Sequence, residues 1–279
     1  MKTSRDCYEC LQRLTYQAAK LAANDEQTRA QAIEEGLKAL EENFSCGEVS
    51  IVIATKIHDA IKATTRNPDP YREMKDKEIT IARELSREIK LDRRDDLNGL
   101  LKLAALGNAI DFFKPIDIIK RDIRGQMEFI IDDSEQLEAR LKDASKVLYL
   151  ADNAGEVFFD LPLLKRMRQL TSVVSVVKAL PVQNDITLDD IRRAGLESEI
   201  GDVITTGTAT PGIDFAVAST QFKHEFANAD FIFAKGMGYY ESLSELPVEG
   251  RIFYCLMTKC QPVADSIKVP LNSYVAILK

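Results

Sequence analysis

The sequence has no tryptophan and only two histidines, His58 and His224, in 279 residues. These histidines lie far apart in the chain and lack the spacing of metal ligands, which argues against a histidine-rich zinc hydrolase site. Any metal chemistry must therefore depend on oxygen ligands. Long apolar runs are also missing, so the sequence predicts no membrane span.

Cysteine is scarce and odd in number, which argues against the fully paired disulfides of a secreted protein. The five cysteines are Cys7, Cys10, Cys46, Cys255 and Cys260. No apolar segment follows the charged N-terminal residues, so no signal peptide is predicted and we expect a cytoplasmic protein. A net charge of -7 argues against nucleic-acid binding, because such proteins concentrate positive charge to neutralise phosphates.

The chain divides into a helical first part and an alternating second part. Apolar residues recur every three or four positions from residue 10 to about 113, with a loop predicted at the two prolines of residues 67–70. Beyond a further predicted helix at 135–142, β-branched runs alternate with helical stretches. The runs are 147–150, 173–177, 203–205, 231–234, 252–256 and 274–278, and the helical stretches are 157–168, 188–194 and 215–227.

This alternation predicts a Rossmann-like three-layer α/β/α domain with a mostly parallel sheet. We expect this α/β domain to cover residues 115–279 and an N-terminal all-α domain to cover residues 1–114. In open α/β sheets, ligands bind beyond the carboxyl ends of the strands, so the residues after each run are the first candidates for a site.

Oxygen donors follow the first two runs of this set. Asp152 and Asn153 come after one run and Asp185 after the next, and together they predict a site for one divalent cation. The alternative is that these residues only cap the helices that begin near Glu156 and after Thr187, since Asp and Asn are favoured caps. For each residue taken alone, capping and metal binding carry equal weight. The convergence of the strand ends favours metal binding.

Two later strand ends carry groups suited to a phosphate. The loop from Thr206 and Gly207 to Gly212 offers hydroxyls and close backbone approach, and Lys235 precedes Gly236 at the next strand end. An ordinary turn and a solvated lysine are the alternatives. Neither a P-loop nor a dinucleotide fingerprint is present.

A CxxC motif, Cys7 to Cys10, opens the first predicted helix. A structural zinc site here would need Cys255 or Cys260 from the far end of the chain, and a thioredoxin-like site would follow a strand instead. Buried or incidental thiols and a metal or redox role are equally weighted interpretations.

Taken together, six motifs in this order resemble the damage-control phosphatase family, formerly domain of unknown function 89, and its prokaryotic CxxC-containing branch. They are Asp6-Cys7-x-x-Cys10, Gly107-Asn108-Ala109-Ile110-Asp111, Asp152-Asn153-Ala154-Gly155-Glu156, Pro181-x-x-Asn184-Asp185-Ile186-Thr187, Gly207-x-x-x-Pro211-Gly212 and Lys235-Gly236. The resemblance implies a helical domain packed on a Rossmann-like domain, and metal-dependent hydrolysis of phosphate monoesters such as sugar phosphates or damaged phosphometabolites.

The resemblance also assigns roles to individual residues. It places Mn²⁺, Ni²⁺, Co²⁺ or Mg²⁺ on Asp152, Asn153 and Asp185, and it adds Lys235 to the catalytic set. The expected substrate-binding residues are Asn108, Asp111, Glu156, Thr206, Gly207 and Gly236.

The sequence leaves the nucleophile open between water and Asp152, which could form a phospho-aspartate. Two other functions stay open: a non-catalytic sensor of a metal or phosphometabolite with Cys7 and Cys10 as a switch, and an S-adenosylmethionine-dependent carboxyl methyltransferase. The expected partner is a small phosphate ester, with neither nucleic acid nor membrane.

Overall fold

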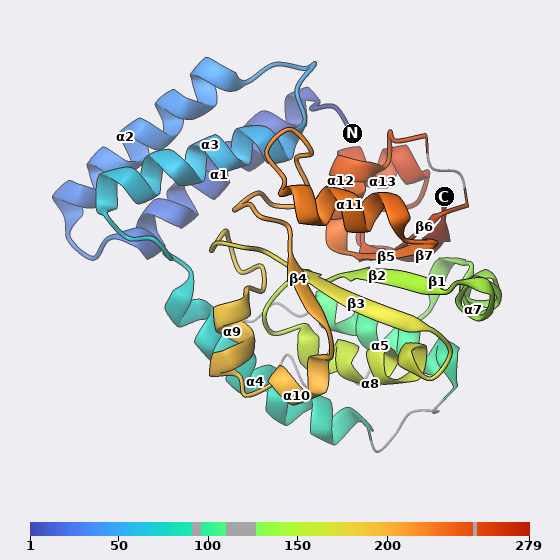
Figure 1. Cartoon of the computed structure of the whole chain (residues 1–279). Coiled ribbons are helices and arrows are strands. Elements are labelled where there is room, and N and C mark those ends of the chain that lie inside the picture. Colours follow the sequence, from blue (N-terminus) through green and yellow to red (C-terminus); the bar gives the residue numbers. More distant parts are fainter. Residues whose placement is uncertain (91–95, 110–126, 248–249) are drawn as a thin grey trace.

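The computed structural model describes residues 1–90, 96–109, 127–247 and 250–279 (Figure 1). The helices of the first part are α1 (Arg5–Ala22), α2 (Glu26–Asn43), α3 (Ser50–Thr65), α4 (Arg72–Lys90) and α5 (Leu97–Ala109). The predicted helical pattern is confirmed over these ranges, and the loop predicted at 67–70 separates α3 from α4.

Seven strands form one sheet in the second part. They are β1 (Phe129–Asp132), β2 (Lys146–Leu150), β3 (Ser172–Val177), β4 (Val203–Thr205), β5 (Phe231–Lys235), β6 (Ile252–Met257) and β7 (Tyr274–Leu278). Their order across the sheet is β1-β7-β6-β5-β2-β3-β4, and every neighbouring pair is parallel except β6 with β7. The mostly parallel sheet is therefore confirmed.

The helices that accompany the strands are α7 (Ser134–Asp143), α8 (Val157–Arg168), α9 (Leu188–Arg193), α10 (Glu197–Ile200), α11 (Thr220–Asn228), α12 (Gly236–Leu243) and α13 (Gln261–Ile267). The helix predicted at 215–227 is shorter than expected. It begins at Thr220, because the Ser219 hydroxyl caps it by accepting from the amide of Phe222 over 3.1 Å. The sequence pattern did not reveal β1, α10, α12 or α13.

Both faces of the sheet are covered, as a buried parallel sheet requires. Along β2, Val147 and Tyr149 enter the core on the face of α5 and α8, and Leu148 and Leu150 enter the core on the face of α11, α12 and α13. Figure 1 shows these two layers on opposite sides of the sheet. The predicted α/β/α layering is confirmed.

The N-terminal helices divide between two cores. Helices α1, α2 and α3 have their own apolar cluster, whereas α4 and α5 contribute residues such as Leu85 and Leu101 to the core on one face of the sheet. The predicted domain boundary at residue 114 lies outside the described residues, so it stays a prediction. Because α4 and α5 pack on the sheet, they can present side chains at its edge.

The winding of the sheet reverses between β2 and β5. From β2 the chain proceeds outward through β3 to β4, then returns to place β5 on the other side of β2. At such a switch point the loops after the two strands diverge and leave a crevice where ligands bind. Asp152 follows β2 and Gly236 follows β5.

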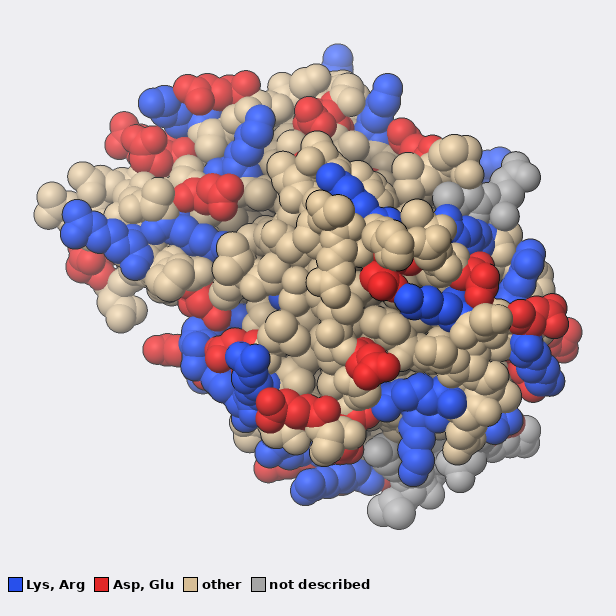
Figure 2. Space-filling view, in the orientation of Figure 1, with Lys and Arg blue, Asp and Glu red and all other residues tan. Residues whose placement is uncertain are grey.

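Charged side chains are distributed over the surface. Among the described residues on the face in Figure 2, Lys and Arg alternate with Asp and Glu and are not gathered into one basic area. No helix in the described ranges is both long enough and apolar enough to cross a membrane.

Candidate metal and phosphate site

The loops after β2 and β3 are joined by hydrogen bonds that bring the three predicted metal ligands together. Asn153 and Asp185 form an isolated antiparallel bridge. The amide of Ile186 donates to the carbonyl of Asp152 over 2.8 Å, and the amide of Ala154 donates to the carbonyl of Asn184 over 2.9 Å. Two segments separated by about thirty residues are thus fixed against each other at the sheet edge.

The helices after these loops are not capped by the predicted ligands. Helix α8 has Glu156 at its N-cap without a side-chain cap, and α9 is capped by Thr187, whose hydroxyl bonds with Asp190. Capping therefore does not explain Asp152, Asn153 or Asp185. None of their side-chain oxygens caps α8 or α9.

Asn108 of α5 reaches this cluster from the helical part of the chain. Its amide nitrogen donates to Oδ2 of Asp152 over 3.0 Å and to Oε1 of Glu156 over 2.8 Å. Its amide oxygen accepts from the backbone N–H of Met257 over 3.1 Å. Asn153 also donates to Glu156 Oε1, over 2.6 Å. The structure thus brings together four predicted site residues: Asn108, Asp152, Asn153 and Glu156.

Lys235 is fully buried behind Glu156 and does not project into solvent. Its ammonium donates to Oδ1 of Asp160 over 2.7 Å and to the carbonyl of Ala104 over 2.6 Å, and it lies 3.2 Å from Oε2 of Glu156. Burial lowers the pKa of Lys235, but Asp160 and Glu156 outweigh it, so the net shift is upward. Lys235 therefore makes two hydrogen bonds and an ion pair with Glu156, which makes it an electrostatic anchor for Glu156.

The carboxylates of the predicted ligands Asp152 and Asp185 are buried, and their pKa values are raised. Burial, together with the charges of Glu156 and Asp185, raises the pKa of Asp152 well above its usual range. Burial also raises the pKa of Asp185 to about 6, against the opposing effect of Lys178, whose ammonium is 3.4 Å from Oδ2. Burial thus disfavours the charged form of both carboxylates, and a bound cation would stabilise that form.

Gly236 allows the carboxylate of Asp152 to pack directly against its backbone. A Cβ placed on Gly236 would lie 2.0 Å from Oδ2 of Asp152, and the residue has a φ of +78° that favours glycine. Within the described ranges, no three His, Cys, Asp or Glu side chains are grouped to hold a metal. The set of Asp152, Asn153 and Asp185 has two carboxylates and one amide, and it fits a hard divalent cation completed by water.

The predicted phosphate loop lies at the ends of β3 and β4. Thr206 is buried, its hydroxyl lies 3.3 Å from that of Thr208, and Gly207 with φ +81° packs tightly against Ser219. Lys178 connects this loop to the ligands, since it bonds to the carbonyl of Gly212 over 2.6 Å and pairs with Asp185. Asp111, the remaining predicted residue, lies outside the described residues.

Two residues that the sequence reasoning missed extend the cluster. Glu78 of α4 is buried and accepts from the amide nitrogen of Asn184, at 3.1 and 3.2 Å to its two oxygens. Lys259 follows β6, is exposed, and lies close enough to lower the carboxyl pKa of both Asp152 and Glu78. Lys259 could have been predicted from its position after a predicted strand. Glu78 lies within a predicted helix, and no sequence pattern marks it as a site residue.

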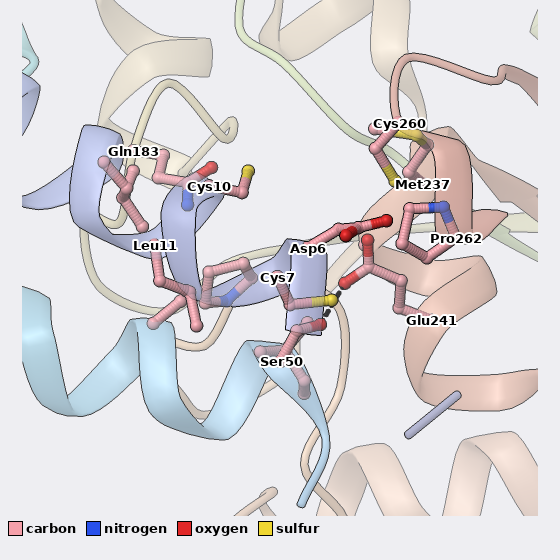
Figure 3. A pocket seen from close by; sticks show the side chains of 15 residues that line it. Asp6, Cys7, Cys10, Leu11, Ser50, Gln183, Met237, Glu241, Cys260 and Pro262 are labelled. Atoms are coloured by element: carbon pink, nitrogen blue, oxygen red, sulfur yellow. Dashed lines mark hydrogen bonds between the residues drawn. The ribbon is translucent and has the colours of Figure 1, made fainter. Parts of the chain in front are cut away.

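A cavity of about 270 Å³ lies between α1, α3 and the neighbouring strand-end loops (Figure 3). Cys7 and Cys10 line it from α1, while Met237 and Cys260 line it from the opposite side. All five cysteines are free, and burial raises the pKa of Cys260 to about 11. Both interpretations of Cys7 and Cys10, as incidental thiols and as a metal or redox site, stay predictions.

Comparisons with known proteins cover nearly the whole chain. The family model of the damage-control phosphatase ARMT1-like domain matches residues 3–275. A damage-control phosphatase of Pyrococcus horikoshii is 33% identical over 285 residues, covering 99% of this chain and 98% of the relative. One from Archaeoglobus fulgidus is 33% identical over 291 residues, covering 99% of each.

A solved structure agrees with these matches. The crystal structure of a DUF89 family protein from Pyrococcus horikoshii has a TM-score of 0.92 and 32% identity, and the match covers 100% of this chain and 99% of that one. Full-length similarity in both sequence and structure extends over the ordered motifs and the sheet-edge cluster. The chain therefore belongs to the damage-control phosphatase family and is a phosphatase.

Proposed function

We propose that this phosphatase is metal-dependent and hydrolyses phosphate monoesters of small metabolites, such as sugar phosphates or damaged phosphometabolites, in a house-cleaning role. One observation supports it most: Asp152 with Asn153 and Asp185, from two different strands, meet at the switch point of the sheet with their oxygens free of helix-capping duties. The proposal includes a cytoplasmic location, because all five cysteines are free.

Asp152, Asn153 and Asp185 would hold one divalent cation, with Mn²⁺, Ni²⁺, Co²⁺ and Mg²⁺ as the candidates. When bound, the cation supplies a Lewis acid for a phosphoryl oxygen. Asn108 and Glu156 orient the ligands, since Asn108 bonds to both Asp152 and Glu156 while Asn153 bonds to Glu156.

Lys259 would bind the phosphoryl oxygens directly. Its charge is exposed and acts on Asp152 and Glu78, whereas the ammoniums of Lys235 and Lys178 are buried in ion pairs. Lys235 would contribute by holding Glu156 in place, a positioning role. The Thr206-Gly207 loop and Gly236 would add close backbone approach to the phosphate.

We propose water as the nucleophile, with a phospho-aspartate on Asp152 as the alternative. The buried hydrogen bonds to Oδ2 of Asp152 hold its carboxylate as a fixed ligand. Reduction with borohydride during turnover separates the two: a phospho-aspartate is reduced to homoserine at position 152, whereas direct attack by water leaves Asp152 unchanged.

Phosphate release from a panel of sugar phosphates, phosphorylated cofactors and nucleotides tests the proposal. We expect turnover with Mn²⁺, Ni²⁺, Co²⁺ or Mg²⁺ and its loss with a chelator. Tight binding of a panel member without release of phosphate would instead identify the sensor function, for which Cys7 and Cys10 at the cavity would be the switch.

A further inference from the structure

The cavity of about 270 Å³ lies over the same edge of the sheet as the proposed metal ligands. One of its walls consists of residues that come after four successive strands: Gln183 after β3, Pro211 after β4, Met237 and Gly238 after β5, and Cys260 and Pro262 after β6. Helices α1 and α3 form the opposite wall (Figure 3). Because ligands of open α/β sheets bind beyond the carboxyl ends of the strands, the cavity occupies the position of a ligand site.

The cavity borders the proposed metal and phosphate site through residues adjacent in the chain. Met237 follows Gly236, against whose backbone the carboxylate of Asp152 packs. Cys260 follows Lys259, the proposed phosphate-binding cation, and the amide of Lys259 donates to Sδ of Met237 over 3.2 Å. A phosphate held at Asp152 and Lys259 would therefore have this cavity beside it.

Contacts between the loops hold the strand-end wall in place. A Cβ added to Gly212 would lie 2.2 Å from the carbonyl oxygen of Gly238, so the loop after β4 touches the start of α12. The hydroxyl of Ser242 donates to the same carbonyl over 2.9 Å. On the other wall, Lys62 of α3 donates to the carbonyl of Pro181 in the loop after β3. The cavity is therefore pre-formed, as most small-molecule sites are.

The two charged side chains that line the cavity, Asp6 of α1 and Glu241 of α12, are both acidic. Among the described residues that line it there is no lysine, arginine or histidine. Figure 3 shows the two carboxylate groups pointing toward one another, and the hydroxyl of Ser50 donates to Oε2 of Glu241. The ammonium of Met1 bonds to the backbone carbonyl of Glu241 and pairs with Glu245 at 3.8 Å. A negatively charged group that entered the cavity would be repelled by both carboxylates.

Most of the remaining lining is apolar. Leu11, Ile51 and Ala54 contribute from the helical wall, and Met237 contributes from the strand-end wall. The volume is close to the lower end of the range of about 300–1,000 Å³ for small-molecule pockets. The cavity therefore suits a small group with apolar surface, whose hydroxyl or ammonium groups can donate to the two carboxylates.

We propose that the cavity receives the leaving group of the phosphate ester, and that Asp6 and Glu241 select esters whose leaving group carries no negative charge. This inference rests on the proposed phosphatase function. Phosphorylated polyols, sugars and amines would be accepted, because their donors meet carboxylate acceptors. Phosphorylated carboxylic acids and bisphosphates would be disfavoured, because their second anionic group meets like charge.

The experiment compares glycerol 3-phosphate with 3-phosphoglycerate, two esters of similar size in which a hydroxymethyl group replaces a carboxylate. Both are measured as competitive inhibitors of p-nitrophenyl phosphate hydrolysis in saturating Mn²⁺, a readout that does not require either ester to be turned over. We expect 3-phosphoglycerate to bind more weakly by about tenfold or more. Raising the ionic strength from about 0.05 to about 0.5 M should reduce this preference, because salt screens the repulsion.

Glu241→Gln and Asp6→Asn each remove one charge while keeping the size of the side chain. In each variant the preference for glycerol 3-phosphate over 3-phosphoglycerate should fall severalfold. Because the preference is a ratio within one protein, a smaller active fraction does not alter it, and Asp6→Asn at its exposed position decides the matter should Glu241→Gln not fold. Glu9→Gln, exposed on α1 and outside the cavity lining, is the matched control and should keep the wild-type ratio.

Alkylation of Cys10 tests the position of the leaving group without changing an acid. Cys10 is an exposed thiol that lines the cavity, and a Cys46→Ser background removes the exposed thiol of Cys46, which lies outside the lining. After reaction with N-ethylmaleimide, glycerol 3-phosphate should inhibit severalfold more weakly. Inhibition by inorganic phosphate should stay the same, because phosphate has no leaving group to place in the cavity.

The failure of this inference is distinguishable from the failure of the proposed function. Equal inhibition by the two esters, or a preference that neither salt nor the acid variants alter, would overturn selection by charge. If alkylation of Cys10 weakened glycerol 3-phosphate and inorganic phosphate equally, or weakened neither, the leaving group would not lie in the cavity. Absence of p-nitrophenyl phosphate turnover by the wild-type protein with every candidate metal would contradict the phosphatase function itself.

Discussion

The amide nitrogen of Asn108 donates a 3.0 Å hydrogen bond to Oδ2 of Asp152, joining α5 to the loop after β2. The same amide group donates to Glu156 and accepts from Met257, so a single side chain connects a helix, two strand ends and the start of α8. This connection fixes the orientation of Asp152, the first of the proposed metal ligands.

Replacing Asn108 with alanine should therefore weaken metal binding and stability together. The change removes one of the two donors to Asp152 Oδ2 and to Glu156 Oε1, which keep only the contacts of Asn153, at a cost of about 1 kcal/mol for each bond. Loss of such an orienting contact typically lowers metal affinity by about 10- to 100-fold. Calorimetric titration with Mn²⁺ and thermal unfolding measure both effects. Asn24→Ala, at an exposed position between α1 and α2, is the control, and an equal affinity for Mn²⁺ in the two variants would contradict this role of Asn108.

Gly236→Ala should abolish Mn²⁺ binding and phosphatase activity, because the new methyl group would collide with the Asp152 carboxylate and displace it. Gly195→Ala is the matched control: Gly195 also has a positive φ, of 63°, but a Cβ added there would meet no atom within 4 Å. Gly195→Ala therefore measures the effect of alanine at a positive φ without a steric clash. Comparable Mn²⁺ titrations of the two variants would show that Mn²⁺ binding does not depend on the position of the Asp152 carboxylate.

Much of the fold and part of the site follow from local sequence. Hydrophobic periodicity predicts six of the strands, since buried β-branched runs are a local property, but it does not predict β1, a four-residue strand with one exposed isoleucine, Ile130. The positions of Asp152, Asn153 and Asp185 after predicted strands mark them as site candidates, because ligands bind beyond the carboxyl ends of the strands in open α/β sheets.

The remaining site residues depend on long-range packing. The position of Lys235 at the end of β5 predicts contact with a phosphate. In the structure Lys235 instead forms a buried ion pair with Asp160, one turn into α8, and no local sequence pattern reveals this pair. Glu78 belongs to an ordinary amphipathic helix by its sequence. Only the docking of α4 on the loop after β3 places its carboxylate against Asn184.

The stability of the protein should depend on the ionisation of Glu78. Because its folded pKa is raised from 4.5 to about 8, the folded state holds the proton more tightly, so this contribution is present below about pH 4.5 and is lost as pH rises to 8. At about 1.4 kcal/mol per pKa unit, the loss amounts to a few kcal/mol.

Glu78→Gln removes this dependence, so its melting temperature relative to the wild type should rise between pH 5 and pH 8.5. Asp185 and Asp160, whose pKa values burial raises to about 6, titrate in both proteins and cancel in the comparison. Glu84→Gln should follow the wild type at every pH. A constant difference between Glu78→Gln and the wild type across this range would show that Glu78 is ionised in the folded protein.

Lys259→Ala should lower kcat/KM by about 10²-fold or more, the usual effect of removing one group that stabilises transition-state charge. Its exposed position means that the melting temperature should change little. Lys223→Ala, an exposed lysine on α11, is the matched control for loss of a surface charge. Steady-state kinetics in which both variants match the wild type would remove Lys259 from the phosphate site.

Mn²⁺-dependent hydrolysis of p-nitrophenyl phosphate by Asp152→Ala and Asp185→Ala tests the metal-dependent site most directly. Asp143→Ala serves as the control, because Asp143 is an exposed carboxylate that precedes β2 and so lies at the opposite edge of the sheet. We expect both ligand variants to lose turnover with Mn²⁺, Ni²⁺ or Mg²⁺ while Asp143→Ala retains it. Undiminished turnover in both ligand variants would contradict the assignment of Asp152 and Asp185 as the metal site.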